Sequence, residues 1–159
     1  MKIHIAQQNY TVGDFNRNTS SIIEAIKEAE KEGAELIIFS ELCVCGFPSE
    51  DLLLSEMYID KVMESIQEIR EHTEHIGVII GAPERNASSE GKRLFNSAWF
   101  LFNKEILGTT GKAHLSDFGI FNQSRYFEPG DGVSVFSFKN KKIAITIGED
   151  IYYFKKDFS

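Results

Sequence analysis

Charged side chains follow apolar, strand-like segments at three places, and these are where the sequence could do chemistry. Glu41 follows one apolar run, Lys112 lies in a loop between two small residues, and Glu149 and Asp150 follow the last apolar run. In open α/β sheets, binding and reacting groups gather at the carboxyl ends of strands. These four residues are therefore the first candidates for a functional site.

Glu41 and Lys112 suit two different roles. A carboxylate beside a buried apolar strand is partly desolvated, which favours its use as a general base. Lys112 has Gly111 and Ala113 as neighbours, so a ligand could come close enough for the ammonium to stabilise an oxyanion. Each residue taken alone also has a simpler interpretation, a surface glutamate at a strand end and a solvated loop lysine.

The remaining acidic residues, the histidines and the cysteines do not by themselves indicate a particular reaction. Glu149 and Asp150 are adjacent, so they diverge on a regular element, and Asp150 is expected to cap whatever follows it. The four histidines lack the spacing of metal ligands, and we expect no metal. Cys43 and Cys45 would point to opposite faces of an extended backbone, so we expect no bridge between them and a reducing cytoplasm.

The elements that must position these residues alternate between strand-like and helix-like patterns, which favours an α/β fold, while the later hairpins argue against a purely parallel sheet. The expected elements are a strand at 2–8, a helix capped by Ser20 or Ser21 and ended by Gly33, a strand at 35–40, a helix with its apolar stripe from Ile59 to Ile69 that stops near Gly77, strands at 78–82, 95–102 and 105–107, a loop over 111–123, and a hairpin of 133–138 with 142–147.

Composition excludes several classes of function. Seventeen basic against twenty-four acidic residues give a net charge of −7 and a pI of about 5.1, which disfavours nucleic acid and anionic membranes as partners. The longest apolar runs are strand-sized, far below the ~20 residues that cross a bilayer. The first residues lack the pattern of a signal peptide. We expect a cytoplasmic globular domain of ordinary size.

Several segments together resemble the nitrilase, or carbon–nitrogen hydrolase, superfamily. They include GAELIIFSELCVCGFPSEDLLL, GKAHLSDFGIFNQSRYFEPGD and IAITIGEDIYY, in this order. The stretches FPSEDLLL and RYFEPGD look most like the N-terminal glutaminase domain of glutamine-dependent NAD+ synthetases. The resemblance implies an α/β fold, a four-layer α-β-β-α sandwich, with glutamine as the substrate.

The resemblance also implies a Glu-Lys-Cys triad. Its glutamate, the general base, falls on Glu41, and its lysine, which stabilises the oxyanion, falls on Lys112. The position of the nucleophilic cysteine falls on Gly148, and glycine has no side chain that could attack. The nearby Cys45 reads as structural. We therefore expect the chain as given to be inactive.

Three further positions are the candidate substrate-binding residues. Phe118 stands where an aromatic hydroxyl is common in the family, and Gln123 stands where an acidic residue is common. A neutral Gln123 would hold an ammonium group less strongly than a carboxylate. Glu149, next to the position of the lost nucleophile, is the third.

The resemblance bears on domains and partners as well. Residues 1–159 are expected to be a partial domain, a sandwich incomplete at its C-terminus. No cofactor is expected here, because ATP and deamido-NAD+ belong to a synthetase domain that the sequence lacks. Homo-oligomers through the sandwich faces are expected. The alternatives are a non-catalytic interaction module that pairs with strands of a partner, and an amidase or nitrilase of another branch.

Overall fold

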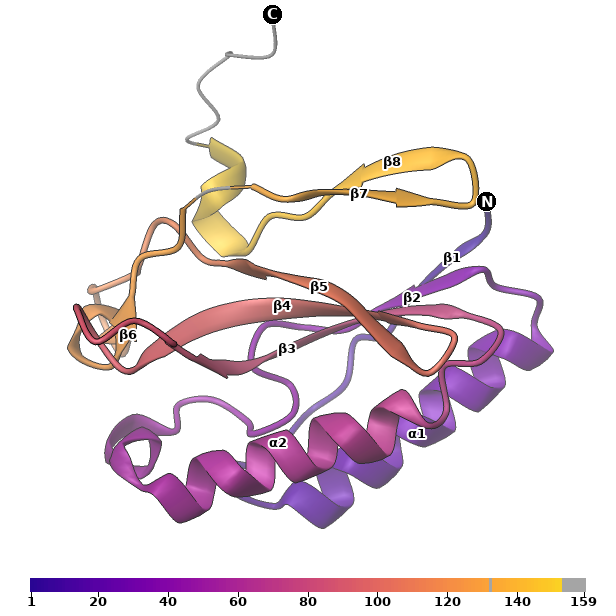
Figure 1. The fold of residues 1–159 in the computed structure, drawn as a ribbon. Coiled ribbons are helices and arrows are strands. Elements are labelled where there is room, and N and C mark those ends of the chain that lie inside the picture. Colours follow the sequence, from indigo (N-terminus) through magenta and orange to yellow (C-terminus); the bar gives the residue numbers. More distant parts are fainter. Residues whose placement is uncertain (132, 153–159) are drawn as a thin grey trace, which may run out of the picture.

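A six-stranded mixed sheet is the central layer of the computed structural model, which describes residues 1–131 and 133–152 (Figure 1). Its strands run in the order β1-β2-β3-β4-β5, and β6 pairs with β4 outside this path. β1 and β2 are parallel, as are β2 and β3, whereas β3, β4 and β5 pair antiparallel. The bounds are β1 Ile3–Ile5, β2 Leu36–Ile38, β3 Gly77–Arg85, β4 Leu94–Phe102, β5 Glu105–Gly111 and β6 Phe127–Glu128.

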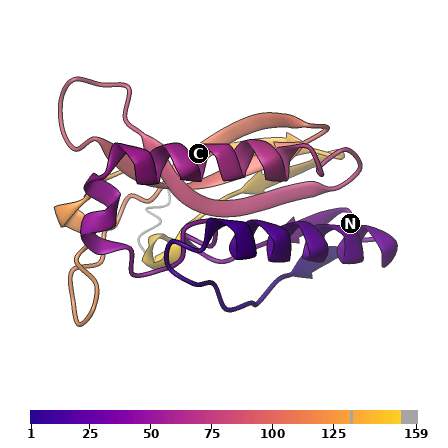
Figure 2. The ribbon, with the colours of Figure 1, turned by 90° about the horizontal axis from the view of Figure 1, so that it is seen from below.

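Two helices cover one face of this sheet, α1 (Phe15–Lys31) and α2 (Glu56–Arg70). Figure 2 shows them side by side across that face. Each buries one apolar stripe at helical spacing, which is what holds an amphipathic helix on a sheet. The stripes comprise Ile22, Ile26 and Ala29 on α1 and Ile59, Val62, Ile66 and Ile69 on α2.

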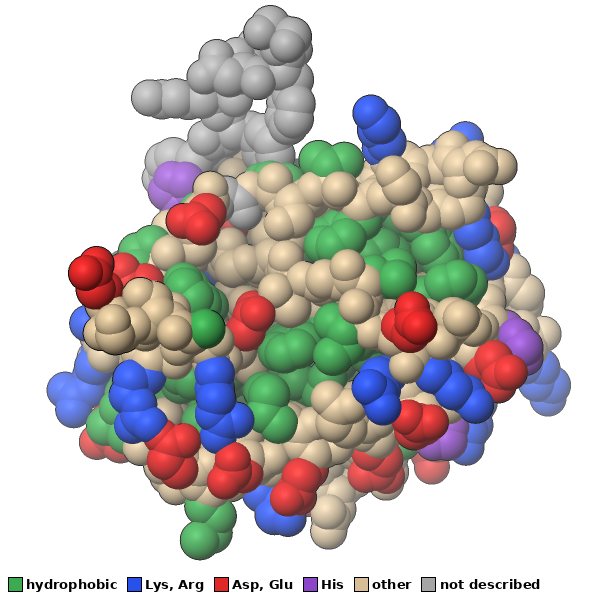
Figure 3. Space-filling view, in the orientation of Figure 1, with side chains coloured by type: hydrophobic (Ala, Val, Ile, Leu, Met, Phe, Trp, Pro, Cys, Tyr) green, Lys and Arg blue, Asp and Glu red, His purple; other side chains and the backbone are tan. Residues whose placement is uncertain are grey.

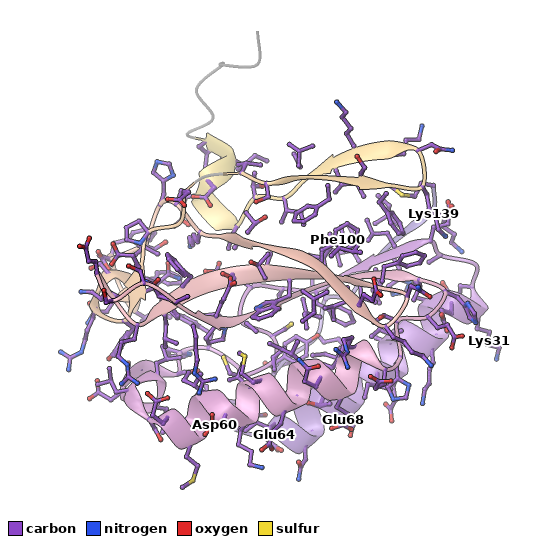
Figure 4. All side chains as sticks on the ribbon, in the orientation of Figure 1. Lys31, Asp60, Glu64, Glu68, Phe100 and Lys139 are labelled. Carbon is purple, nitrogen blue, oxygen red and sulfur yellow. The ribbon has the colours of Figure 1, made fainter. Side chains whose placement is uncertain are left out.

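A small second sheet lies over the opposite face. It is the antiparallel pair β7 (Val135–Phe138) and β8 (Lys141–Ala144). Phe100 of β4 lies between the two sheets and meets Phe136 and Phe138 edge to face, with ring centroids 5.4 and 5.3 Å apart (Figure 4). Burial of these rings ties the hairpin to the large sheet and so places the chain that follows β8.

Three short 3-10 helices complete the described residues, at Glu50–Leu54, Gln123–Arg125 and Gly148–Tyr152. The sequence prediction of an α/β fold with a mixed sheet is confirmed. None of the helices described in residues 1–131 and 133–152 is long and apolar enough to span a bilayer.

The start of α1 differs from the expectation. The N-cap is Asp14, whose side chain accepts a hydrogen bond from the backbone N–H of Arg17 at 3.2 Å, and neither Ser20 nor Ser21 caps the helix. The helix starts early because Phe15 packs against Tyr58 of α2, with ring centroids 5.0 Å apart. A tertiary contact of this kind extends a helix beyond its local signals.

Other expected boundaries were also wrong. The first strand is only Ile3–Ile5, and both isoleucines are exposed because the second sheet does not reach over β1. α2 ends at Arg70, well before Gly77. The last hairpin is shorter than predicted, and Lys139 and Asn140 make its turn with positive φ of 45° and 61°. Turns with two left-handed residues match the twist of paired strands.

Gly81 on β3 fixes the turn that carries Glu41. A Cβ at this position would lie 2.4 Å from the backbone nitrogen of Leu42 and 2.8 Å from Cα of Glu41. Contacts this short are forbidden, so only glycine lets the turn after β2 lie against β3. The residue at position 81 therefore controls where the Glu41 carboxylate stands.

We expect Gly81→Ala to lower the free energy of unfolding by about 3 kcal/mol, because the new methyl group overlaps backbone rather than a mobile side chain. Gly33→Ala is the matched control, since Gly33 has a φ of +76° and open space around it, and it should cost only about 1 kcal/mol. Denaturant unfolding of the two variants measures both losses. Equal losses would show that the contact at Gly81 does not constrain the turn.

Candidate functional site

Glu41 accepts three hydrogen bonds on one carboxylate oxygen. Oε1 receives Asn96 Nδ2 at 2.6 Å, Lys112 Nζ at 3.1 Å and Gln123 Nε2 at 3.0 Å. The donors come from β4, from the residue after β5 and from the 3-10 helix at Gln123–Arg125. A carboxylate with three donors on one oxygen is fixed in orientation, which leaves its other oxygen, Oε2, to face position 148.

Lys112 is 1% exposed and lies between two carboxylates. Its Nζ is 3.1 Å from Glu41 Oε1 and 3.0 Å from Glu149 Oε2, and it donates to Ser116 Oγ at 3.3 Å. An ammonium buried without partners would cost several kcal/mol, so these acceptors are what allow Lys112 to be buried. The three charged groups together carry a net charge of −1.

Glu149 is the second carboxylate of this cluster. Its Oε1 accepts a short hydrogen bond from the Ser116 hydroxyl, and its Oε2 faces Lys112. The Ser116 hydrogen bond, with Lys112 as a further cause, lowers the pKa of Glu149 to about 2. Glu149 therefore stays ionised at neutral pH and is fixed beside Lys112.

Gly148 lies against this cluster. A Cβ built on Gly148 would lie 3.1 Å from Lys112 Nζ and 3.4 Å from Glu41 Oε2. Its φ is +53°, in the left-handed region that L residues rarely adopt. The structure therefore brings Glu41, Lys112 and position 148 together, although they are far apart in the sequence.

A cavity of about 290 Å³ reaches this point from the space between the two sheets. Its polar end includes Glu41, Asn96 and Gly148. Isoleucines of both sheets, such as Ile38, Ile79 and Ile143, line its apolar walls. A water molecule occupies about 30 Å³ in the liquid, so the cavity is large enough for a small organic molecule. The cavity thus borders both Glu41 and Gly148.

Gln123 lies beside Glu41 in this cluster, and its predicted role in substrate binding stays a prediction. It is 3% exposed, donates to Glu41 through Nε2 and accepts from the Ser116 backbone N–H through Oε1 at 3.0 Å. Phe118 does not contact this cluster: it is 64% exposed and packs against Phe121, with ring centroids 5.3 Å apart. Its role as a substrate-binding residue stays a prediction.

Asn96 and Ser116 were missed by the sequence analysis. Asn96 binds both Glu41 and Lys112. Its side chain donates to the Glu41 carboxylate, and its backbone carbonyl accepts from the Lys112 backbone N–H at 2.8 Å. Ser116 joins Lys112 to Glu149. An asparagine inside the apolar strand LFNSAWF is a signal that could have been found, since a buried amide needs a partner.

Asp150 does not cap a following helix as expected. Its buried carboxylate accepts from the backbone N–H groups of Ala113 at 3.1 Å and His114 at 2.8 Å. It therefore ties the turn that begins at Gly148 to the loop that begins at Lys112. These two hydrogen bonds help to keep Gly148 and Lys112 side by side.

The two cysteines, Cys43 and Cys45, are free and buried. Burial raises the pKa of Cys43 to about 12 and that of Cys45 to about 11. A thiol that stays protonated is a poor nucleophile. The expectation that no bridge joins them is confirmed, although both lie in a turn and not on a strand.

Comparison with known proteins decides the family. The carbon–nitrogen hydrolase model matches residues 2–155. The chain belongs to the carbon–nitrogen hydrolase family. The resemblance stated from the sequence motifs is therefore confirmed.

Among curated relatives, this carbon–nitrogen hydrolase is similar to glutamine-dependent NAD(+) synthetases. It is 34% identical to that of Thermotoga maritima over 152 residues, which cover 96% of this chain and 26% of the relative. It is also 34% identical to that of Acinetobacter baylyi, covering 95% of this chain and 27% of the relative. The chain thus matches the N-terminal part of these proteins and spans about a quarter of their length.

Solved structures agree with this assignment. The glutamine-dependent NAD+ synthetase of Acinetobacter baumannii, solved with ADP, superposes with a TM-score of 0.86 at 33% identity, covering 94% of this chain and 28% of that one. A mutant of the Nesterenkonia AN1 amidase from the nitrilase superfamily gives a TM-score of 0.79 at 20% identity, covering 96% and 57%. The second match shows the fold alone: an α/β fold that covers part of a nitrilase-superfamily domain.

The lowered pKa of Glu149 makes a prediction about stability. Because the pKa in the folded chain lies below its ordinary value of 4.5, ionised Glu149 stabilises the fold above about pH 4.5, and this stabilisation is lost as pH falls towards 2. We expect Glu149→Gln to lower the free energy of unfolding by about 1–2 kcal/mol at pH 7, a value reduced for partial exposure.

Denaturant unfolding between pH 7 and pH 2 tests this. The difference between the native chain and Glu149→Gln should shrink as pH falls. Glu24→Gln, a change on the exposed side of α1, should show no such convergence. A constant difference for Glu149→Gln across the range would contradict the assigned ion pair.

Proposed function

We propose that this chain is a glutaminase-type domain that binds the amide group of glutamine beside Glu41 and Lys112 but does not hydrolyse it. One observation supports this above all. The side chain of residue 148 would point between Lys112 Nζ and Glu41 Oε2, and residue 148 is glycine. The base and the oxyanion-stabilising cation are in place, and the attacking atom is missing.

The chemistry of the remaining groups supports binding without turnover. Lys112 is an ammonium donor held in a fixed position, suited to a carbonyl oxygen that gains negative charge. Glu41 Oε2 is a carboxylate oxygen that faces position 148, and it is suited to accept from an N–H group or to take the proton of a nucleophile. Covalent catalysis splits amide cleavage into two easier steps, and without a nucleophile that route is closed.

The substrate class rests on the relatives. The proteins of similar sequence are glutamine-dependent NAD(+) synthetases, and we propose the same amide donor, glutamine, for this chain. We further propose an incomplete four-layer α-β-β-α sandwich, a partial domain with no cofactor of its own and a cytoplasmic location. ATP and deamido-NAD+ would then belong to a separate synthetase domain, and contact between copies would use the sandwich faces.

A second candidate function is a non-catalytic interaction module. β5 is an edge strand of the large sheet, and Ile106, Leu107 and Val135 are 37%, 40% and 48% exposed near that edge. Figure 3 shows hydrophobic side chains gathered on this face, between the small sheet and the edge of the large one. An exposed edge with apolar neighbours can pair with a strand of a partner.

The native chain should release no glutamate from glutamine above a blank without protein. Gly148→Cys should form a glutamyl adduct visible by intact-mass spectrometry, because its Sγ starts from a Cβ between Lys112 and Glu41. Activity should stay below that of a complete domain, partly because a side chain at a φ of +53° costs roughly 1–2 kcal/mol.

Two controls make this result specific. Gly148→Cys combined with Glu41→Gln should form no adduct, since the base is lost. Gly33→Cys adds a cysteine at another left-handed glycine, far from the cluster in open space, and should also form none. Glutamate release or a covalent adduct with the native chain would refute the proposal.

A further inference from the structure

A second cavity lies at the end of the molecule where the chain passes from β3 to β4. Its volume is about 500 Å³, and none of the described residues that line it belongs to the cluster around Lys112. The β3–β4 loop forms one wall, and the 3-10 helix at Glu50–Leu54 together with the start of α2 forms another. We propose that this cavity binds a small organic phosphate, that is, a phosphate monoester with an apolar or aromatic group.

The lining of this cavity is positively charged, although the chain as a whole carries a net charge of −7. Among the residues that the structure describes, four basic side chains line it, and Glu56 is the one acidic residue that does. The basic residues are Arg85, Lys92, Arg93 and Arg125. Figure 3 shows Lys and Arg side chains gathered at the lower left, where Figure 1 has β6 and the loop after β3. Positive charge concentrated in a concave site favours a small anion.

Carboxylates hold the three arginines in place and leave them donors for a ligand. The ion pairs are Arg85 with Glu56 at 3.3 Å and with Asp60 at 2.7 Å, Arg93 with Glu56, and Arg125 with Asp51 at 3.2 Å. Each pair uses Nη2 of the arginine, and Nη1 and Nε make no hydrogen bond to another described residue. A guanidinium carries N–H donors on all of its nitrogens, so these arginines are oriented and can still bind phosphate oxygens.

The β3–β4 loop holds Lys92 in a fixed backbone position. The Asn86 side chain donates to the Lys92 carbonyl at 2.8 Å, and the Asn86 backbone N–H donates to the Arg93 carbonyl at 2.8 Å. The Lys92 backbone N–H donates to Glu128 Oε2 at 2.8 Å. The Lys92 ammonium forms no ion pair with a carboxylate of residues 1–131 and 133–152. A loop whose backbone is already ordered loses less entropy when a ligand binds.

Buried apolar side chains form the floor of this cavity. Leu53, Ile59 and Leu94 all line it and are 5%, 3% and 5% exposed. Leu54 lines it as well and is 57% exposed. A bare phosphate ion would leave this apolar surface in contact with water, whereas an apolar or aromatic ester group would cover it. Cations beside an apolar floor therefore favour an organic phosphate over an inorganic one.

Isothermal calorimetry with the native chain tests this proposal. Phenyl phosphate carries the anion and an apolar ring, inorganic phosphate carries the anion alone, and phenol carries the ring alone. We expect phenyl phosphate to bind about 10-fold more tightly than inorganic phosphate, because it also buries apolar surface, and phenol to give no measurable binding. Equal affinities for the two phosphates, or no binding of phenyl phosphate at millimolar concentration, would overturn the site.

Two exposed cations of the lining provide the charge variants. Arg93→Ala and Lys92→Ala should each weaken phenyl phosphate binding about 10-fold, because each removes charge-assisted hydrogen bonds. Arg17→Ala and Lys27→Ala are the matched controls, since they remove the same charges from exposed positions of α1, and they should leave the affinity unchanged. Equal losses in a variant and its control would show attraction to the whole chain and would contradict a site in this cavity. Unfolding curves establish that each variant is folded.

Leu54→Ala separates the apolar contribution from that of the charges. It should weaken phenyl phosphate binding and leave inorganic phosphate binding unchanged. Leu52→Ala is its control, because Leu52 lies in the same 3-10 helix, is 47% exposed and is not among the described residues that line the cavity. Identical phenyl phosphate affinities for the two leucine variants would exclude the apolar floor from the site.

The headgroup of phosphatidic acid is also a phosphate monoester, so the source of the ligand needs its own measurement. We expect no sedimentation of the native chain with phosphatidic acid vesicles, because the net charge of −7 opposes contact with an anionic surface. Vesicle binding that is lost in Lys92→Ala would assign these cations to a lipid surface and would overturn the proposal of a soluble ligand.

Discussion

The burial of the Lys112 ammonium between two carboxylates is the interaction on which the rest of the site depends. Glu41 lies in the turn after β2, Lys112 directly follows β5, and Glu149 lies in the 3-10 helix that comes after β8. Three segments far apart in the chain are thus joined by one buried charge. Burying an ammonium group without a partner costs several kcal/mol, so Lys112 must keep both carboxylates beside it. The segments that carry Glu41 and Glu149 must therefore lie next to the segment that carries Lys112.

Hydrogen bonds from neighbouring residues fix the orientation of the charged groups in this ion cluster. Asn96 binds the Glu41 side chain and the Lys112 backbone, Gln123 binds Glu41 and the Ser116 backbone, and Asp150 binds the loop after Lys112. A charge pair alone has little directional preference, whereas these hydrogen bonds set orientation. The same hydrogen bonds also hold the chain at Gly148 beside Lys112. These hydrogen bonds hold the geometry with glycine at position 148.

Sheet packing explains why the cluster sits next to a cavity. The β7–β8 hairpin covers part of the large sheet through Phe136 and Phe138, and the chain then runs from Ile143 to Gly148 above Ile38 and Ile79. Ile3 and Ile5 on β1 remain exposed on the part that the hairpin does not reach. One short hairpin has too little apolar surface to cover six strands, and the space between the layers extends to Glu41 and Gly148. The candidate site therefore lies at the end of a cavity between the hairpin and the large sheet.

The sequence by itself determined the family, the α/β class, the mixed sheet, and three positions that meet in the site, Glu41, Lys112 and Gly148. Motifs and short-range periodicity are local, so they can be read from residue types alone. The sequence did not reveal that Asn96 and Ser116 belong to the cluster, that Asp150 binds the loop after Lys112, or that α1 begins at Phe15. Those features depend on contacts between segments that are far apart in the sequence. In such contacts, a buried polar side chain takes as its partner whichever group the fold brings within hydrogen-bond distance. Tertiary structure alone showed that a Cβ on residue 148 would lie close to both the Glu41 carboxylate and the Lys112 ammonium, because this depends on the direction of the Cα–Cβ bond in space.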